Sequence, residues 1–151
     1  MSPAPRFLIR GSGFLCLTML TACSSSAPPV ARVRVVARDY SFGVPASLPA
    51  GETYFQLVNE GTVRHEIQLY RFRPGVTRDS ALHLIASDDF PDSVVDVDGG
   101  VLISGPNDSA VQQLVAPLHS GDVYGLECAF RNGSGQPVHS KLGMFSVFEV
   151  K

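Results

Sequence analysis

Hydrophobic and polar residues alternate along most of the 151-residue chain, in short runs that turn-forming residues separate. Alternation with a period of two is typical of β-strands that bury one face. The clearest run is HEIQLYRF, in which His65 shares a face with Ile67 and Leu69. The pattern predicts strands over residues 31–42, 53–61, 65–72, 109–118, 122–130 and 144–150, and turns over residues 44–52.

One segment has helical rather than strand-like spacing. Residues 77–87 begin with Thr77, a residue type favoured as a helix N-cap, and carry Asp79 in the first turn. The acidic segment that follows, residues 88–100, predicts a loop. Several short strands, Gly- and Pro-containing turns and a single helix predict an all-β fold, a β-sandwich with one short helical insertion.

The N-terminus has the pattern of an export signal. It carries Arg6 and Arg10 but no acidic residue, and the apolar run FLCLTML that follows is too short to span a bilayer as a helix. The sequence LTAC at residues 20–23 resembles a bacterial lipobox, which implies cleavage before Cys23 and attachment of lipid to it. An ordinary cleaved signal peptide is the alternative interpretation.

This pattern predicts a lipoprotein signal peptide over residues 1–22, a lipidated Ser- and Pro-rich tether over residues 23–30 and one folded domain over residues 31–151. Two or more acyl chains give stable membrane anchoring, because each buried methylene contributes about 0.8 kcal/mol. We therefore expect a cell-envelope protein that is lipid-anchored on the periplasmic or extracellular side of a membrane.

The composition is that of a globular protein, with 44% hydrophobic and 17% charged residues. Without residues 1–22, 10 of the 12 basic residues remain against 14 acidic ones, which gives a formal charge of −4. No basic cluster occurs in the sequence, so we expect no nucleic acid among the partners. We expect the domain to be a monomer.

The candidate chemistry lies towards the C-terminus. Cys128 is the only cysteine after Cys23, Met144 is the only methionine after position 19, and His139 lies between them. With Cys23 acylated, Cys128 has no disulfide partner in the chain, although the expected compartment allows disulfides. A thiolate, two imidazoles and a distant thioether are the ligands of a mononuclear blue copper site. His65, at the start of a strand, would supply the second imidazole.

These residue types suit a centre that gains and loses one electron. The thiolate stabilises Cu(I), imidazoles accommodate Cu(I) and Cu(II), and a weak thioether favours neither geometry strongly. Little has to move when the electron arrives. The candidate metal ligands are His65, Cys128, His139 and Met144.

The same residues resemble the cupredoxin family. NEGTVRHEIQL resembles the family strand that brings the first histidine, here His65, HSKLGM has the His-x4-Met spacing, and GMFSVFEV resembles the last strand. The resemblance covers residues 31–151 and implies a Greek-key sandwich that holds one type 1 copper ion and passes single electrons to a redox partner of unknown identity. It also implies that Asn59 and Gly61 fix the loop before His65.

The sequence departs from the family in one loop. Ten residues separate Cys128 from His139, more than small electron-transfer cupredoxins usually have, and we expect this loop to add surface over the metal. We expect the electron to pass along an exposed edge of the His139 imidazole, because its loop should lie on the surface.

Other functions remain open for the same residues. A copper carrier or a metal-free cupredoxin-like binding module would use the same sandwich. A thiol enzyme is possible because an imidazole such as His139 can lower the pKa of a thiol such as Cys128, but nothing nearby resembles an oxyanion hole or a resolving cysteine. A multicopper oxidase would need His-x-His pairs, which the sequence lacks. We therefore expect an electron carrier and not an enzyme.

Overall fold

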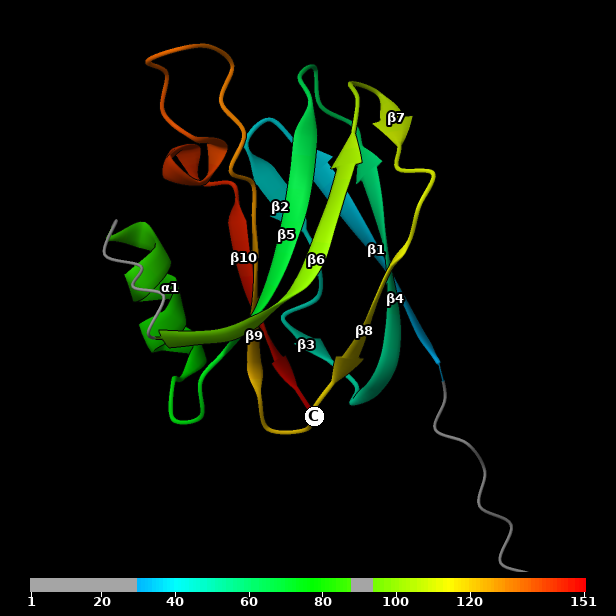
Figure 1. The fold of residues 1–151 in the computed structure, drawn as a ribbon, viewed down its shortest axis with the longest axis vertical. Coiled ribbons are helices and arrows are strands. Elements are labelled where there is room, and N and C mark those ends of the chain that lie inside the picture. Colours follow the sequence, from blue (N-terminus) through cyan, green and yellow to red (C-terminus); the bar gives the residue numbers. More distant parts are fainter. Residues whose placement is uncertain (1–29, 88–93) are drawn as a thin grey trace, which may run out of the picture.

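Two five-stranded β-sheets pack face to face in the computed structural model, which describes residues 30–87 and 94–151 (Figure 1). The first sheet contains β1 (Ala31–Arg38), β2 (Ser41–Gly43), β4 (Gly51–Asn59), β7 (Asp108–Ser109) and β8 (Leu114–Leu118). The second contains β3 (Ser47–Leu48), β5 (His65–Phe72), β6 (Val95–Ser104), β9 (Val123–Glu127) and β10 (Phe145–Val150).

The chain crosses repeatedly between the sheets. The strand order is β2-β1-β4-β7 in the first sheet, where β8 also pairs with β4, and β3-β10-β9-β5-β6 in the second. After the β5–β6 pair the chain passes to β7 and β8 in the other sheet, and it returns as β9 beside β5. This Greek-key crossing confirms the predicted all-β sandwich. It also makes β5 and β9 antiparallel neighbours, so the start of β5 and the end of β9 lie at one end of the sandwich.

Alternating residues of the strands fill the space between the sheets. His65, Ile67 and Leu69 all point into it, as the sequence predicts, and each is fully buried. Phe55 from the first sheet and Leu126 from the second are also fully buried in this core. Burying a side chain of this size contributes about 1.5–3 kcal/mol, so this apolar interior holds the strands that carry the candidate ligands in place.

Helix α1 (Arg78–Ala86) lies between β5 and β6 in the chain and covers the outer face of the second sheet (Figure 1). Thr77 is the N-cap, and its hydroxyl accepts a hydrogen bond from the backbone N–H of Ser80. Ala81 and Ile85 pack with Tyr70 and Phe72 in a second apolar cluster. The predicted helix is therefore confirmed.

The structure corrects the predicted boundaries of several segments. β3 and the start of β4 lie within the turns predicted over residues 44–52, and the strand predicted over residues 53–61 is β4, which ends at Asn59. The strand predicted over residues 31–42 is two strands, because the chain turns at Asp39 and Tyr40 between β1 and β2. The strand predicted over residues 109–118 is interrupted between β7 and β8. The strand predicted over residues 122–130 ends at Glu127, so Cys128 lies just beyond it.

The prediction of a loop over residues 88–100 is wrong for residues 95–100, which the structure describes as part of a strand. Residues 95–100 belong to β6, an edge strand of the second sheet. An edge strand tolerates acidic side chains that face solvent, and Asp96 there forms ion pairs with Arg71 and Arg73. Residues 88–93 lie outside the described part of the chain.

The predicted signal peptide, Cys23 and the tether up to residue 29 also lie outside the described residues. Within residues 30–87 and 94–151, no helix has both the length and the apolar character to cross a membrane.

Candidate metal centre

Four elements bring the candidate ligands to the same end of the sandwich. His65 is the first residue of β5, and Cys128 directly follows β9. His139 begins a short 3-10 helix (His139–Leu142) at the end of the long loop, which extends beyond the sandwich in Figure 1. Met144 immediately precedes β10. The topology thus unites residues that are far apart in the sequence.

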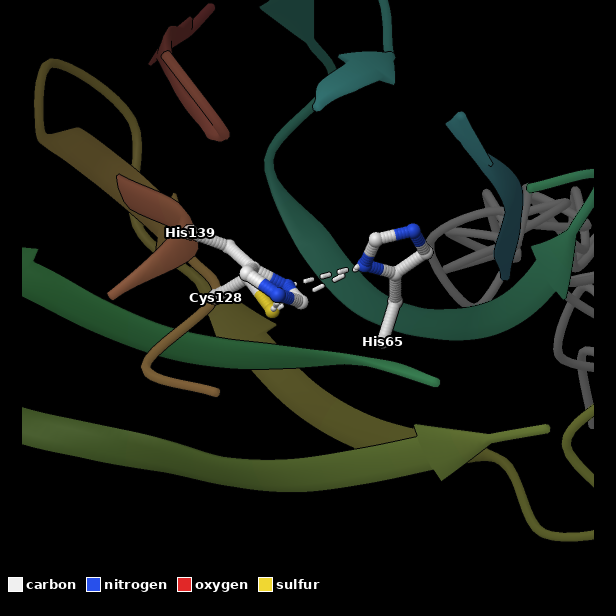
Figure 2. A group of neighbouring side chains, drawn as sticks. All are labelled: His65, Cys128 and His139. Carbon is white, nitrogen blue, oxygen red and sulfur yellow. Dashed lines mark hydrogen bonds between the residues drawn. The ribbon is translucent and has the colours of Figure 1, made fainter. Parts of the chain in front are cut away.

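Three donor atoms converge on one point. The Nδ1 atoms of His65 and His139 are 3.2 Å apart, and the Cys128 sulfur lies 3.4 Å from Nδ1 of His139 and 4.0 Å from Nδ1 of His65. Figure 2 shows the His65 ring turned towards the other two side chains. A circle through three atoms with these separations has a radius of about 2.1 Å, which is close to the 2.0–2.3 Å that separates a first-row metal from nitrogen and sulfur ligands.

Backbone hydrogen bonds hold the loop that carries two of these donors. The Cys128 N–H donates to the Met144 carbonyl (3.2 Å), and the Met144 N–H donates to the His139 carbonyl (3.0 Å). The Ser140 N–H donates to the Cys128 carbonyl (3.0 Å). Cys128, His139 and Met144 are therefore locked together through their backbones before any metal binds, and Met144 is fully buried beside Cys128 in the same apolar cluster.

Asp39 is an outer partner of the site that the sequence pattern did not reveal. Its Oδ1 lies 2.7 Å from Nε2 of His65. Partial burial alone would raise the pKa of Asp39, but hydrogen bonds from the Thr62 hydroxyl and N–H and from His65 outweigh this and lower it to about 2. The carboxylate is thus ionised at neutral pH, and it accepts a hydrogen bond from the Nε2–H of His65.

Asn132 has the corresponding position at the other histidine. Its Oδ1 accepts a hydrogen bond from Nε2 of His139 (2.9 Å), and its Nδ2 donates to the Tyr40 hydroxyl (2.7 Å). The Tyr40 ring stands edge-on to the His139 ring, with 4.8 Å between the ring centroids. A ligating histidine usually donates its second N–H to such a partner, which fixes its tautomer and orientation.

These two acceptors set which nitrogen of each imidazole carries the proton, and therefore what the centre can bind. If both Nε2 atoms carry protons, both Nδ1 atoms present lone pairs to the same buried point. The Cys128 thiol has one proton, which can satisfy only one of them. A buried acceptor without a donor costs about 1–3 kcal/mol, and a cation at the common point removes that cost for both nitrogens and the sulfur. The donor set therefore fits a metal ion.

The electrostatics point the same way. Burial raises the pKa of the Cys128 thiol, and burial together with the nearby His65 lowers the pKa of His139. Without a metal, the thiol is protonated and the imidazole is neutral at physiological pH. This is the reverse of the thiolate–imidazolium pair that a thiol enzyme needs.

Asn59 and Gly61 fix the turn before His65, as the resemblance implies. The Asn59 Oδ1 accepts a hydrogen bond from the Gly61 N–H (2.8 Å), and its Nδ2 donates to the carbonyls of Val63 and Ser104. A side chain at position 61 would collide with the Asp39 carboxylate and would lie 2.9 Å from Nε2 of His65. Glycine here leaves room for the hydrogen bond between Asp39 and Nε2 of His65, behind the ligand.

The expectation of an exposed imidazole edge at His139 is wrong. His139 is only 1% exposed and His65 is 0% exposed, and Cys128 and Met144 are also completely buried. The long loop lies on the surface, but the ring itself is covered by Asn132 and Tyr40. Sequence spacing identifies which residues meet, but not what lies above them.

No protein-family model matches the chain, and a search of curated proteins finds no match. Among solved structures, auracyanin B has 19% sequence identity and a TM-score of 0.49, over 81% of this chain and 88% of that one. A dithionite-reduced auracyanin from Roseiflexus castenholzii has 15% identity and a TM-score of 0.49, over 83% and 99%. Auracyanin A, a "blue" copper protein from Chloroflexus aurantiacus, has 12% identity and a TM-score of 0.49, over 82% and 100%.

The case for a metal ion therefore comes from the donor atoms themselves. His65, Cys128 and His139 are the one group of potential metal-ligating His, Cys, Asp and Glu residues found in the described ranges 30–87 and 94–151. The backbone of Met144 is hydrogen-bonded to those of Cys128 and His139. The four residues together form the ligand pattern of a type 1 copper site.

Gly61→Ala tests the packing behind His65. The new methyl group should displace the Asp39 carboxylate from Nε2 of His65, and loss of such an outer partner lowers metal affinity by about 10–100-fold. A competition titration with copper measures the change. Gly43→Ala is the matched control, because a methyl group there makes only ordinary contacts with Val36. Equal copper affinity in the two variants would show that the Asp39 contact is unimportant.

Proposed function

We propose that the folded domain is a type 1 copper protein that transfers single electrons outside the cytoplasm. The observation that carries this proposal is the meeting of one thiol sulfur and two imidazole nitrogens at a point a metal–ligand bond length from each. When bound, the copper ion supplies the one-electron chemistry. His65, Cys128 and His139 would be its strong ligands, and the thioether of Met144 would be the weak fourth ligand.

The surroundings of the donors favour electron transfer over the alternatives. Both imidazoles are held from behind, by Asp39 and by Asn132, so their positions need not change with the charge of the ion. A copper carrier has to release its ion to another protein, and donors that are at most 1% exposed offer no surface for that exchange. A substrate would be excluded for the same reason, which supports a non-enzymatic role.

The partner follows from the proposed chemistry and not from the charge pattern. An electron carrier requires a redox protein to donate the electron and another to accept it, and the formal charge of −4 expected after signal cleavage argues against nucleic acid. We propose that the domain acts as a monomer that meets its redox partners transiently.

We further propose that lipid on Cys23 tethers the domain to a membrane, on the periplasmic or extracellular side. Support comes from the LTAC sequence, the basic residues before it and the Ser- and Pro-rich segment after it. A tethered domain remains close to membrane-bound redox partners, which raises their effective concentration around it.

Cys128→Ser tests the copper assignment. The oxidised wild-type protein should show an intense visible band from charge transfer between the thiolate and Cu(II), and the variant should lose it, because a hydroxyl is not a comparable ligand. The variant should stay folded by circular dichroism, since the sulfur is a small part of the core. A visible band that persists in the variant would refute a thiolate-bound copper.

Met144→Leu tests the weak ligand. The variant should retain copper and have a higher reduction potential, because removing a donor that helps Cu(II) disfavours the oxidised state. Each tenfold loss of relative affinity for Cu(II) corresponds to an increase of about 59 mV for a one-electron couple. Voltammetry measures the shift, with Leu142→Ala, an exposed neighbour, as the control. An unchanged potential would exclude the thioether as a ligand.

Cys23→Ser tests the anchor. In a bacterium that processes lipoproteins, the wild-type protein should incorporate labelled palmitate and fractionate with membranes, whereas the variant should do neither. Cys128→Ser should still be labelled, because the proposed lipid site is Cys23 and the Cys128 thiol is buried in the wild-type domain. A wild-type protein without label would contradict the lipid anchor and leave the copper proposal untouched.

A further inference from the structure

The long loop between Cys128 and His139 turns back towards the ligand that follows it. The His139 N–H donates to the Phe130 carbonyl (2.7 Å), which closes the loop at its base. Residues 131–137 are exposed, yet the side chain of Asn132 makes two hydrogen bonds on the inner side. One of these is to the candidate ligand His139, and the other is to Tyr40, which belongs to the turn between β1 and β2.

We propose that Asn132 and Tyr40 form a clamp that holds His139 in its metal-binding tautomer and orientation before the metal arrives. The proposal rests on the proposed copper site, because it concerns how one of the ligands of that site is prepared. Both members of the clamp are positioning residues, since they would act on the metal through His139 alone.

The direction of the two hydrogen bonds fixes the tautomer. The Asn132 amide donates through Nδ2 to the Tyr40 hydroxyl, so its Oδ1 remains as the acceptor that faces His139. Nε2 of His139 must then carry the proton, and Nδ1 is left with a lone pair. That lone pair points to the place where Nδ1 of His65 lies 3.2 Å away and the Cys128 sulfur lies 3.4 Å away.

The Tyr40 ring fixes the orientation. Its centroid lies 4.8 Å from that of His139 and 6.2 Å from that of His65, and its plane is inclined by 60° and 87° to the two imidazoles, so it stands edge-on to both. Rotation of the His139 ring would push against Tyr40 and break the bond to Asn132. A longer loop has more conformations to lose when it closes. A hydrogen bond from within the loop to its own ligand offsets that freedom.

The two histidines are held by groups of different charge. His65 faces Asp39, an ionised carboxylate, whereas His139 faces a neutral amide. The contact between His65 and Asp39 does not involve Asn132, so the tautomer of His65 is an internal reference for any experiment on the clamp.

The experiment measures the tautomers in the metal-free protein. Histidines labelled with ¹⁵N are observed by long-range ¹H–¹⁵N correlation at about pH 8, where an ordinary imidazole is neutral. The wild-type protein should show His139 predominantly protonated on Nε2. Asn132→Leu should produce a mixture of tautomers, and Asn132→Asp should restore the Nε2-protonated form, because a carboxylate is again an acceptor.

Matched variants separate the clamp from a general disturbance of the loop. Gln136→Leu changes another exposed residue of the same loop and should leave the His139 tautomer unchanged. Tyr40→Phe keeps the ring but removes the hydroxyl that orients the amide, so it should weaken the preference. His65 should keep its proton on Nε2 in every variant, which shows that its contact with Asp39 and the fold are intact, whereas its Nδ1 signal should respond to His139, whose Nδ1 lies 3.2 Å away. A His139 tautomer that is unaffected by Asn132→Leu would overturn the proposal.

A copper competition titration provides a second measurement. Asn132→Leu should bind copper about 10–100-fold more weakly than the Gln136→Leu control, as expected for loss of an outer hydrogen-bond partner. Equal affinities would also overturn the clamp. Failure of the proposed function looks different: the wild-type protein would then bind no copper at all, while the tautomer of His139 could still depend on Asn132.

Discussion

The structure depends on one constraint: three lone-pair donors share a point inside an apolar core. Two imidazole nitrogens 3.2 Å apart and a sulfur beside them cannot all be satisfied by the single proton that the thiol offers. Buried polar atoms are tolerated only when they have partners, so this arrangement is costly for a metal-free domain and favourable for a metal-bound one. The apolar contacts between the two sheets offset that cost.

The sandwich is suited to hold such a point rigid. β5 and β9 are antiparallel neighbours, so the residue that starts one lies near the residue that follows the other. The remaining ligands come from the segment between β9 and β10, which backbone hydrogen bonds tie to both strands' ends. Outside this frame, Asp39 and Asn132 each fix one imidazole. The site is therefore built from the core outwards, and the loop that leads to His139 is tied down by hydrogen bonds.

The sequence predicts the structure correctly where a hydrophobic period or a rare residue carries the information. Alternation placed His65 among core residues, and the scarcity of cysteine and methionine singled out Cys128 and Met144. It failed for Asp39, Tyr40 and Asn132, because polar residues in turns are common and nothing in their spacing shows which side chain points inwards. The prediction of a loop also failed for β6, because aspartates on an edge strand can point to solvent and pair with a cation such as Arg71.

Burial of both imidazoles changes how electron transfer would operate under the proposed function. A ligand ring that reaches the surface lets a partner approach the metal closely, but it also lets water rearrange around the site as the charge changes. Here the Asn132 amide, the Tyr40 ring and the Asp39 carboxylate stand between the rings and solvent. Water is kept from the ligands, so less solvent has to reorganise, but the electron must cross this covering layer.

A continuous route for the electron runs through hydrogen bonds from His139 to Asn132 and from Asn132 to Tyr40, which is partly exposed. The same residues that hold the ligand would therefore form the surface that a redox partner has to touch.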